Sequence, residues 1–217
     1  MSSYVRPSID APVFRDADGE VIDYGNRWAG SPPEDTYSVE THPERFAPLH
    51  AVADALIAHL GDTYDVEVDD GAETAADLLR PAYHDVVRAV RIRPKDPASA
   101  SLTLVFTAYP GISMHAGLLN DFQYPVCGCD ACDSNWEGEA DDLERQVLAV
   151  VTGHYRESIT HGIRPWVEHS FSYPDGGGRG GRSLAQDIPA ARVKAAEPIL
   201  RNLPDGWAAW PPPPSSS

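Results

Sequence analysis

All three cysteines of this 217-residue chain lie in one six-residue stretch, Cys127-Gly128-Cys129-Asp130-Ala131-Cys132. Cysteines that only fill space in a core would be scattered along the chain. The spacing C-x-C-x-x-C is typical of thiolates that converge on one metal ion or exchange with one another. This loop is therefore the place where the sequence points to chemistry.

A structural zinc site is the first interpretation of the loop. Structural Zn²⁺ takes four ligands at about 2.0 to 2.3 Å, and three thiolates supply all but one of them. We expect His115 to complete the site, because it alternates away from the apolar residues of a predicted strand that lies close to the loop in the sequence. His154 and His169 are the other histidine candidates, and Asp130 or Asp133 would be a weaker oxygen ligand.

Other interpretations of the loop stay open. Cys129 and Cys132 form a C-x-x-C pair that could act in thiol redox chemistry, although neither a βαβ unit nor an adjoining helix N-terminus is predicted beside it. The three thiols could also be reduced and inert. A metal-dependent hydrolase would keep the fourth metal position open for a water beside a base such as Glu168. The sequence identifies no catalytic residue, and no G-x-S-x-G elbow is present.

A glycine-rich segment, Gly176 to Arg182, is a weaker signal. Its backbone amides and two arginines could hold an anion, but it lacks the lysine and the strand-turn-helix context of a phosphate-binding loop. We expect a flexible loop here, because glycine-rich segments mostly supply chain freedom.

The chain is strongly acidic, with a formal net charge of −16 at pH 7. The acidity is concentrated toward the N-terminus, since Met1 to Asp85 hold 18 acidic and 5 basic residues. Such a field repels nucleic acid and anionic membrane, so we expect neither as a partner. It favours solubility, and it would attract a basic protein. An acidic protein-interaction module is therefore another functional alternative.

We expect a soluble cytoplasmic protein. The N-terminus has no signal-peptide pattern, and no apolar run is long enough to span a bilayer. In a reducing cytosol, clustered cysteines are thiols or metal ligands before they are disulfides. Arginine strongly outnumbers lysine, a bias that indicates a bacterial source with a GC-rich genome.

The hydrophobic pattern predicts a single α+β domain over residues 41–203, between an extended arm at 1–40 and a flexible Pro/Ser-rich tail at 204–217. We expect an antiparallel sheet of about four strands with two amphipathic helices on one face. The expected strands are 86–93, 102–109, 112–118 and 166–173, with a short edge strand at 64–68. The expected helices begin at capping boxes, from Thr41 to Gly61 and from Ser134 for about six turns, with a broken helix at 188–203.

Taken together, several segments resemble a mainly actinobacterial family catalogued as a domain of unknown function. The resemblance rests on Val13 to Gly19, Asp23 to Trp28, Thr41 to Leu60, Leu79 to Pro94 and the cysteine loop, so it covers most of the chain. It implies one intact domain. It implies no activity, substrate, partner or catalytic residue.

Overall fold

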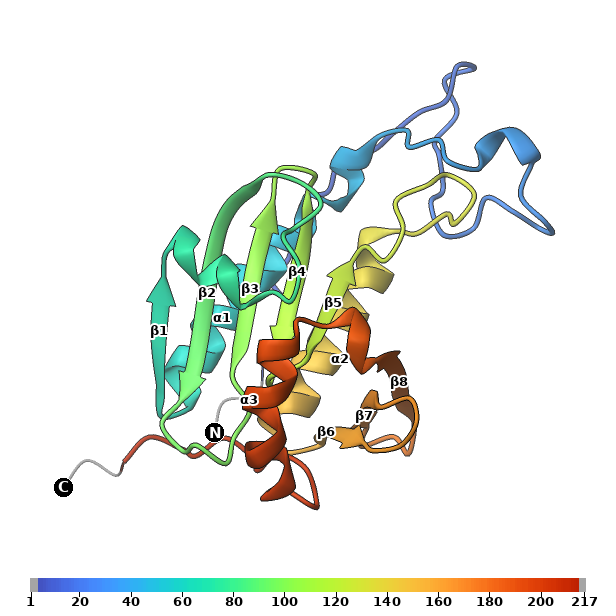
Figure 1. The fold of residues 1–217 in the computed structure, drawn as a ribbon. Coiled ribbons are helices and arrows are strands. Elements are labelled where there is room, and N and C mark those ends of the chain that lie inside the picture. The colour runs from blue at the N-terminus through green and yellow to red at the C-terminus, as the bar shows by residue number, and fades with distance from the viewer. Residues whose placement is uncertain (1–3, 215–217) are drawn as a thin grey trace.

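The computed structural model describes residues 4–214, which form an α+β fold with two antiparallel sheets (Figure 1). The larger sheet is a five-stranded meander in which each strand pairs with the next along the chain. The smaller sheet has three strands, also in sequential order. The strands are β1 (Val66–Asp70), β2 (Val86–Pro94), β3 (Leu102–Thr107), β4 (Gly111–Ala116), β5 (Asn120–Tyr124), β6 (Tyr155–Thr160), β7 (Trp166–Ser172) and β8 (Gly178–Leu184).

Two long helices, α1 (Pro48–Thr63) and α2 (Trp136–Val151), cover one face of the larger sheet, as the sequence predicts (Figure 1). Their apolar stripes and the facing strand residues form one core, with Leu56, Met114 and Val147 fully buried. Each buried side chain of this size contributes about 1.5 to 3 kcal/mol. The third helix, α3 (Ala190–Arg201), packs near β6 and continues through Pro198, where the sequence predicts a break.

The start of α1 differs from the prediction for a clear reason. Thr41 does not cap a helix, because its hydroxyl and its backbone N–H donate to the Asp130 carboxylate at 2.8 and 3.1 Å. A short 3₁₀ helix, Pro43–Phe46, fills the gap before α1. The threonine is a hydrogen-bonding residue as expected, but its partner is distant in the sequence.

The face of the larger sheet that points away from α1 and α2 carries a row of polar side chains. Arg91, Thr103, His115 and Asp121 lie side by side on β2, β3, β4 and β5. A 3₁₀ helix, Ala72–Asp77, covers part of this row, and its last residue accepts hydrogen bonds from Arg91 and Thr103 at 2.5 and 2.6 Å. His115 therefore belongs to a buried polar row under another segment.

The smaller sheet forms where the sequence predicts the end of a longer helix and a flexible loop. The helix expected to run past His154 ends at Val151, and Gly153 adopts a φ of 76°, a left-handed conformation that favours glycine. The chain then forms β6. The glycine-rich segment expected to be flexible forms β8, which pairs along its whole length with β7.

The C-terminal segment packs on the body of the protein. Trp207 and Trp210 are buried, and the carbonyl of Pro211 accepts a 2.9 Å hydrogen bond from the Asp65 backbone. The Pro/Ser-rich tail expected at 204–217 thus includes residues that pack on the body, while residues 215–217 lie outside the described chain. Within residues 4–214, no helix combines the length and the apolar character that a membrane crossing requires.

Candidate metal centre

The cysteine loop joins the end of β5 to the start of α2. On one side, β5 ends at Tyr124 beside Ile112 of β4. On the other, the Asn135 side chain caps α2 by accepting a 2.9 Å hydrogen bond from the Gly138 N–H. The thiols thus precede the first helical turn by several residues, and they lie where an edge strand, a helix and the N-terminal arm meet (Figure 1).

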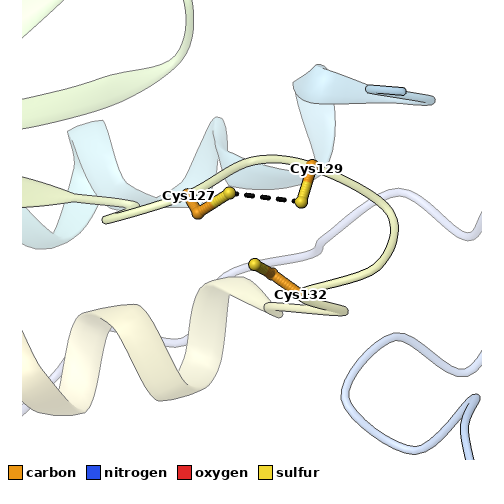
Figure 2. Close-up of side chains that lie close together, drawn as sticks. All are labelled: Cys127, Cys129 and Cys132. Atoms are coloured by element: carbon orange, nitrogen blue, oxygen red, sulfur yellow. Dashed lines mark hydrogen bonds between the residues drawn. The ribbon is translucent and has the colours of Figure 1, made fainter. Parts of the chain in front are cut away.

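The three sulfurs point toward one another (Figure 2). All three lie within 4.8 Å of each other, and the Cys127 Sγ donates a 3.2 Å hydrogen bond to the Cys129 Sγ. None forms a disulfide. Cys127 and Cys129 are half-buried and Cys132 is exposed. The three thiols are therefore held as one group of donors.

The thiols influence each other's ionisation. The pKa of Cys129 lies below its ordinary value, first because of the hydrogen bond from Cys127 and further because of backbone N–H groups, including that of Ser38. The pKa of Cys132 rises to about 12, because its hydrogen bonds with Cys127 and then Cys129 disfavour a further thiolate. Ionisation of all three sulfurs would place like charges together, so it requires a nearby cation.

Asp130, between the second and third cysteines, ties the loop to the arm. Its carboxylate accepts both hydrogen bonds from Thr41, its backbone N–H donates to Val39 at 2.7 Å, and the next N–H, of Ala131, donates to Thr36 at 3.1 Å. This buried carboxylate is thus already engaged. It faces the arm and is not among the clustered donors.

Asp133 is engaged in the same way by Arg27. Its carboxylate accepts hydrogen bonds from the Arg27 Nε and from the Arg27 backbone at 2.8 Å. Asp133 has a left-handed φ of 53°, which this double contact holds in place. Neither aspartate, each offered by the sequence as a weaker oxygen ligand, is among the clustered donors.

Arg45 anchors the loop from the other side. This buried guanidinium donates to the Gly128 carbonyl at 2.8 Å and to the Ser134 carbonyl at 3.2 Å, and it lies 4.4 Å from the centre of the Tyr24 ring. Sequence reasoning missed Arg27 and Arg45, because their partners lie about a hundred residues away and no local pattern marks them.

The structure does not bring the expected fourth ligand, His115, to the cysteines. The His115 Nδ1 lies 2.7 Å from the Asp121 carboxylate, and both residues are about 10 Å along the strands from the Ile112–Tyr124 pair, where β5 ends before the loop. His154 contacts the hydroxyl of Thr152, and His169 packs on Phe122. None of these three imidazoles is in the cluster.

A cavity of about 670 Å³ adjoins the loop and is lined in part by Cys127, Glu40, His84 and Tyr109. His84 stacks on the Tyr109 ring with 4.6 Å between the ring centres. The Tyr109 hydroxyl is buried against Gly128 and has no hydrogen-bond partner among the described residues. His84 carries no sequence signal, because it sits in an irregular segment before β2.

These features fit a metal ion. Sulfur atoms around a tetrahedral Zn²⁺ lie about 3.8 Å apart at a Zn–S distance of about 2.3 Å, and the observed limit of 4.8 Å requires only a small adjustment. The orphaned Tyr109 hydroxyl beside the loop is the kind of buried polar atom that a bound ion or its ligands can satisfy. Within residues 4–214, no histidine, aspartate or glutamate joins the three sulfurs as a fourth donor.

Comparison with known proteins places the chain in a family. The model of a family of unknown function, DUF6226, matches residues 10–214, so the chain belongs to this family, in agreement with the resemblance seen in its segments. Neither the curated proteins nor the solved structures contain a match to the chain.

Proposed function

We propose that Cys127, Cys129 and Cys132 bind one zinc ion and that the role of this ion is structural. The observation that supports the proposal most directly is the convergence of the three sulfurs on a short loop whose other polar side chains are already engaged. Thiolates are the ligands that select Zn²⁺ among the common divalent ions. We further propose a reducing cytosol as the compartment, because free thiols persist there.

In this proposal the ion stabilises the region where the cysteine loop, the N-terminal arm and α2 meet. The loop carries the hydrogen bonds that hold the arm, through Asp130 and Asp133, and it leads directly into α2. Metal binding would restrict the loop in the folded state and thereby stabilise both attachments. This position, between structural elements, supports a non-catalytic role.

Metal analysis tests the proposal. Protein purified without a histidine tag should contain about one equivalent of zinc, and the Cys127→Ser/Cys129→Ser/Cys132→Ser variant should contain none. The Cys127→Ser variant alone should bind zinc more weakly. Less than about 0.2 equivalents of metal in the wild-type protein, after purification in zinc-supplemented medium, would overturn the proposal.

A second candidate is a metal centre with an open position. Structural zinc sites have four protein ligands and catalytic sites three, and the described residues supply three. Cys127 also lines the cavity of about 670 Å³, which holds Glu40 and His84 as possible bases. This arrangement favours a metal-dependent hydrolase, in which the ion activates a water molecule.

Cobalt substitution separates the two candidates. Co²⁺ in a closed site should keep its visible absorption bands when azide is added, whereas an open position should bind azide and shift them. The His84→Ala and Glu40→Gln variants then test whether either side chain swings in to close the site. Loss of the four-coordinate spectrum in one variant would identify the fourth ligand and favour the structural role.

A further inference from the structure

A second cavity, of about 500 Å³, lies between β5, the smaller sheet and the segment that precedes α3, and it shares Arg80 and Asp121 with the cavity beside the cysteine loop. Its lining is partly apolar, through Leu119, Leu184 and Ile188, and partly cationic, through Arg80 and Arg182. A hollow with an apolar wall and a few convergent polar groups is the usual form of a small-molecule site.

Two arginines that form no ion pair with another described residue line this cavity together. At −16 the chain has an excess of carboxylates, and most of its arginines pair with one, as Arg27, Arg91 and Arg179 do. Arg80 and Arg182 form no ion pair with any described residue, although both line the same cavity. Two guanidiniums that pair with no described carboxylate and line one cavity can hold an anion between them.

Both guanidiniums are positioned by neutral partners. Arg182 lies over the Trp166 ring at 4.6 Å, which leaves the edge of the guanidinium free to donate hydrogen bonds. Arg80 donates to the Asp187 carbonyl at 2.9 Å and keeps its other donors. A planar guanidinium held on one side presents a fork of N–H groups that matches an oxyanion.

Two carboxylates, of Asp121 and Asp187, also line the cavity, but neither forms an ion pair with Arg80 or Arg182. Asp121 is occupied by His115 at 2.7 Å and by the Leu79 N–H at 2.8 Å. Asp187 lies at the rim, exposed. Burial, and then Arg179, hold the pKa of His169 below its ordinary value, so this imidazole is a neutral hydrogen-bonding group at pH 7.

Gly181 of β8 lies beside His169, which lines the cavity. A Cβ at Gly181 would lie 2.9 Å from the Cε1 of His169, so a larger residue there would push the imidazole away. The absence of a side chain thus lets the ring lie across β8 beside the cavity. Space for the His169 ring thus explains the glycine at position 181.

We propose that this cavity binds a small organic oxyanion, a carboxylate or a phosphate monoester, with Arg80 and Arg182 holding the anionic group and Trp166, Leu119 and Ile188 contacting an apolar portion. No cysteine lines this cavity, so the proposal does not require a metal in the cysteine loop. It would give the protein a ligand-binding function in addition to the proposed structural zinc.

Calorimetric titration with benzoate, phenyl phosphate and the neutral analogue benzamide tests the proposal. At least one of the two anions should bind saturably, with a dissociation constant below about 1 mM, and the stronger of the two identifies the anion class. Arg80→Ala and Arg182→Ala should each weaken this binding by about 10-fold or more, since each removes charge-assisted hydrogen bonds. Benzamide should not bind.

Arg15→Ala is the matched control, because Arg15 also lacks an ion pair with a described residue and lies in the arm. It removes the same charge and should leave the affinity unchanged. Arg182→Lys keeps the charge but loses the fork, so it should recover only part of the binding. No saturable binding of either anion, equal binding of benzamide, or equal weakening by Arg15→Ala would each overturn the proposal.

Discussion

The indole Nε1 of Trp207 donates a 3.0 Å hydrogen bond to the carboxylate of Glu157, deep in the protein. The same carboxylate accepts hydrogen bonds from the backbone N–H groups of Leu118 and Leu119 and from the Asn120 side chain. Burial raises the pKa of Glu157 above its ordinary value, and the four donors oppose that rise. One buried carboxylate thus joins the β4–β5 turn, β6 and the C-terminal segment.

Replacing this donor should destabilise the protein. Trp207→Phe keeps an aromatic ring but leaves the buried carboxylate with one donor fewer, and we expect a loss of about 1 to 3 kcal/mol in the free energy of unfolding. Urea denaturation measures the loss. Tyr83→Phe, at an exposed aromatic residue, should change the free energy by less than about 0.5 kcal/mol. Equal effects of the two variants would contradict a special role for Trp207.

Zinc removal should release the arm. With free zinc at about 1,000 times the dissociation constant, bound metal contributes about 4 kcal/mol to stability, so a chelator should lower the unfolding midpoint of the wild-type protein. Limited proteolysis should then cut the first forty residues faster. The triple Cys→Ser variant should behave alike with and without chelator. A chelator effect of the same size in that variant would contradict the prediction.

Gly128 should not tolerate a side chain. A Cβ there would lie 1.8 Å from the Tyr109 hydroxyl, so Gly128→Ala must displace the loop or the ring. We expect a loss of about 1 to 3 kcal/mol, measured by thermal unfolding, together with weaker zinc binding. Gly30→Ala is the matched control, because nothing lies within 4 Å of its Cβ position. Tyr109→Phe removes the nearest atom, so in the double variant it should restore part of the loss.

Acidification should weaken the protein through His50. Burial lowers the pKa of this imidazole below 6.5, although a hydrogen bond with the Gly111 carbonyl partly opposes the shift. The unfolded chain then binds more protons below pH 6.5, so stability should fall as the pH drops from 6.5 toward the folded pKa. In urea denaturation at pH 8 and pH 5.5, His50→Gln should show a smaller difference in unfolding free energy than the wild-type protein. An unchanged difference would contradict the prediction.

The sequence predicted the elements whose patterns are local. The stripe in α1 and the alternation in β3 were enough to place the main layers, and a capping signal marked the start of α2. β5 and β8 were missed because most of their residues are polar or glycine, so that pairing with a neighbour, and not an apolar pattern, makes them strands.

The candidate site was predictable only in part. The three cysteines are adjacent in the sequence and were found by spacing. Their surroundings depend on tertiary contacts: His115 proved to be the partner of Asp121, while Arg45 and His84 reached the loop region from segments that carry no motif. Because the unpredicted strand β5 runs back along β4, the loop begins beside Ile112, about 10 Å along the strand from His115.

The attachment of the arm also sets an order of events during synthesis. Arg27 and Thr41 leave the ribosome long before Asp133 and Asp130, the residues to which they bind, and α2 is capped only after both. These two attachments can therefore form only after more than half of the protein has been made. Synthesis of the cysteine loop supplies the residues that bind Arg27 and Thr41 and hold the arm in place.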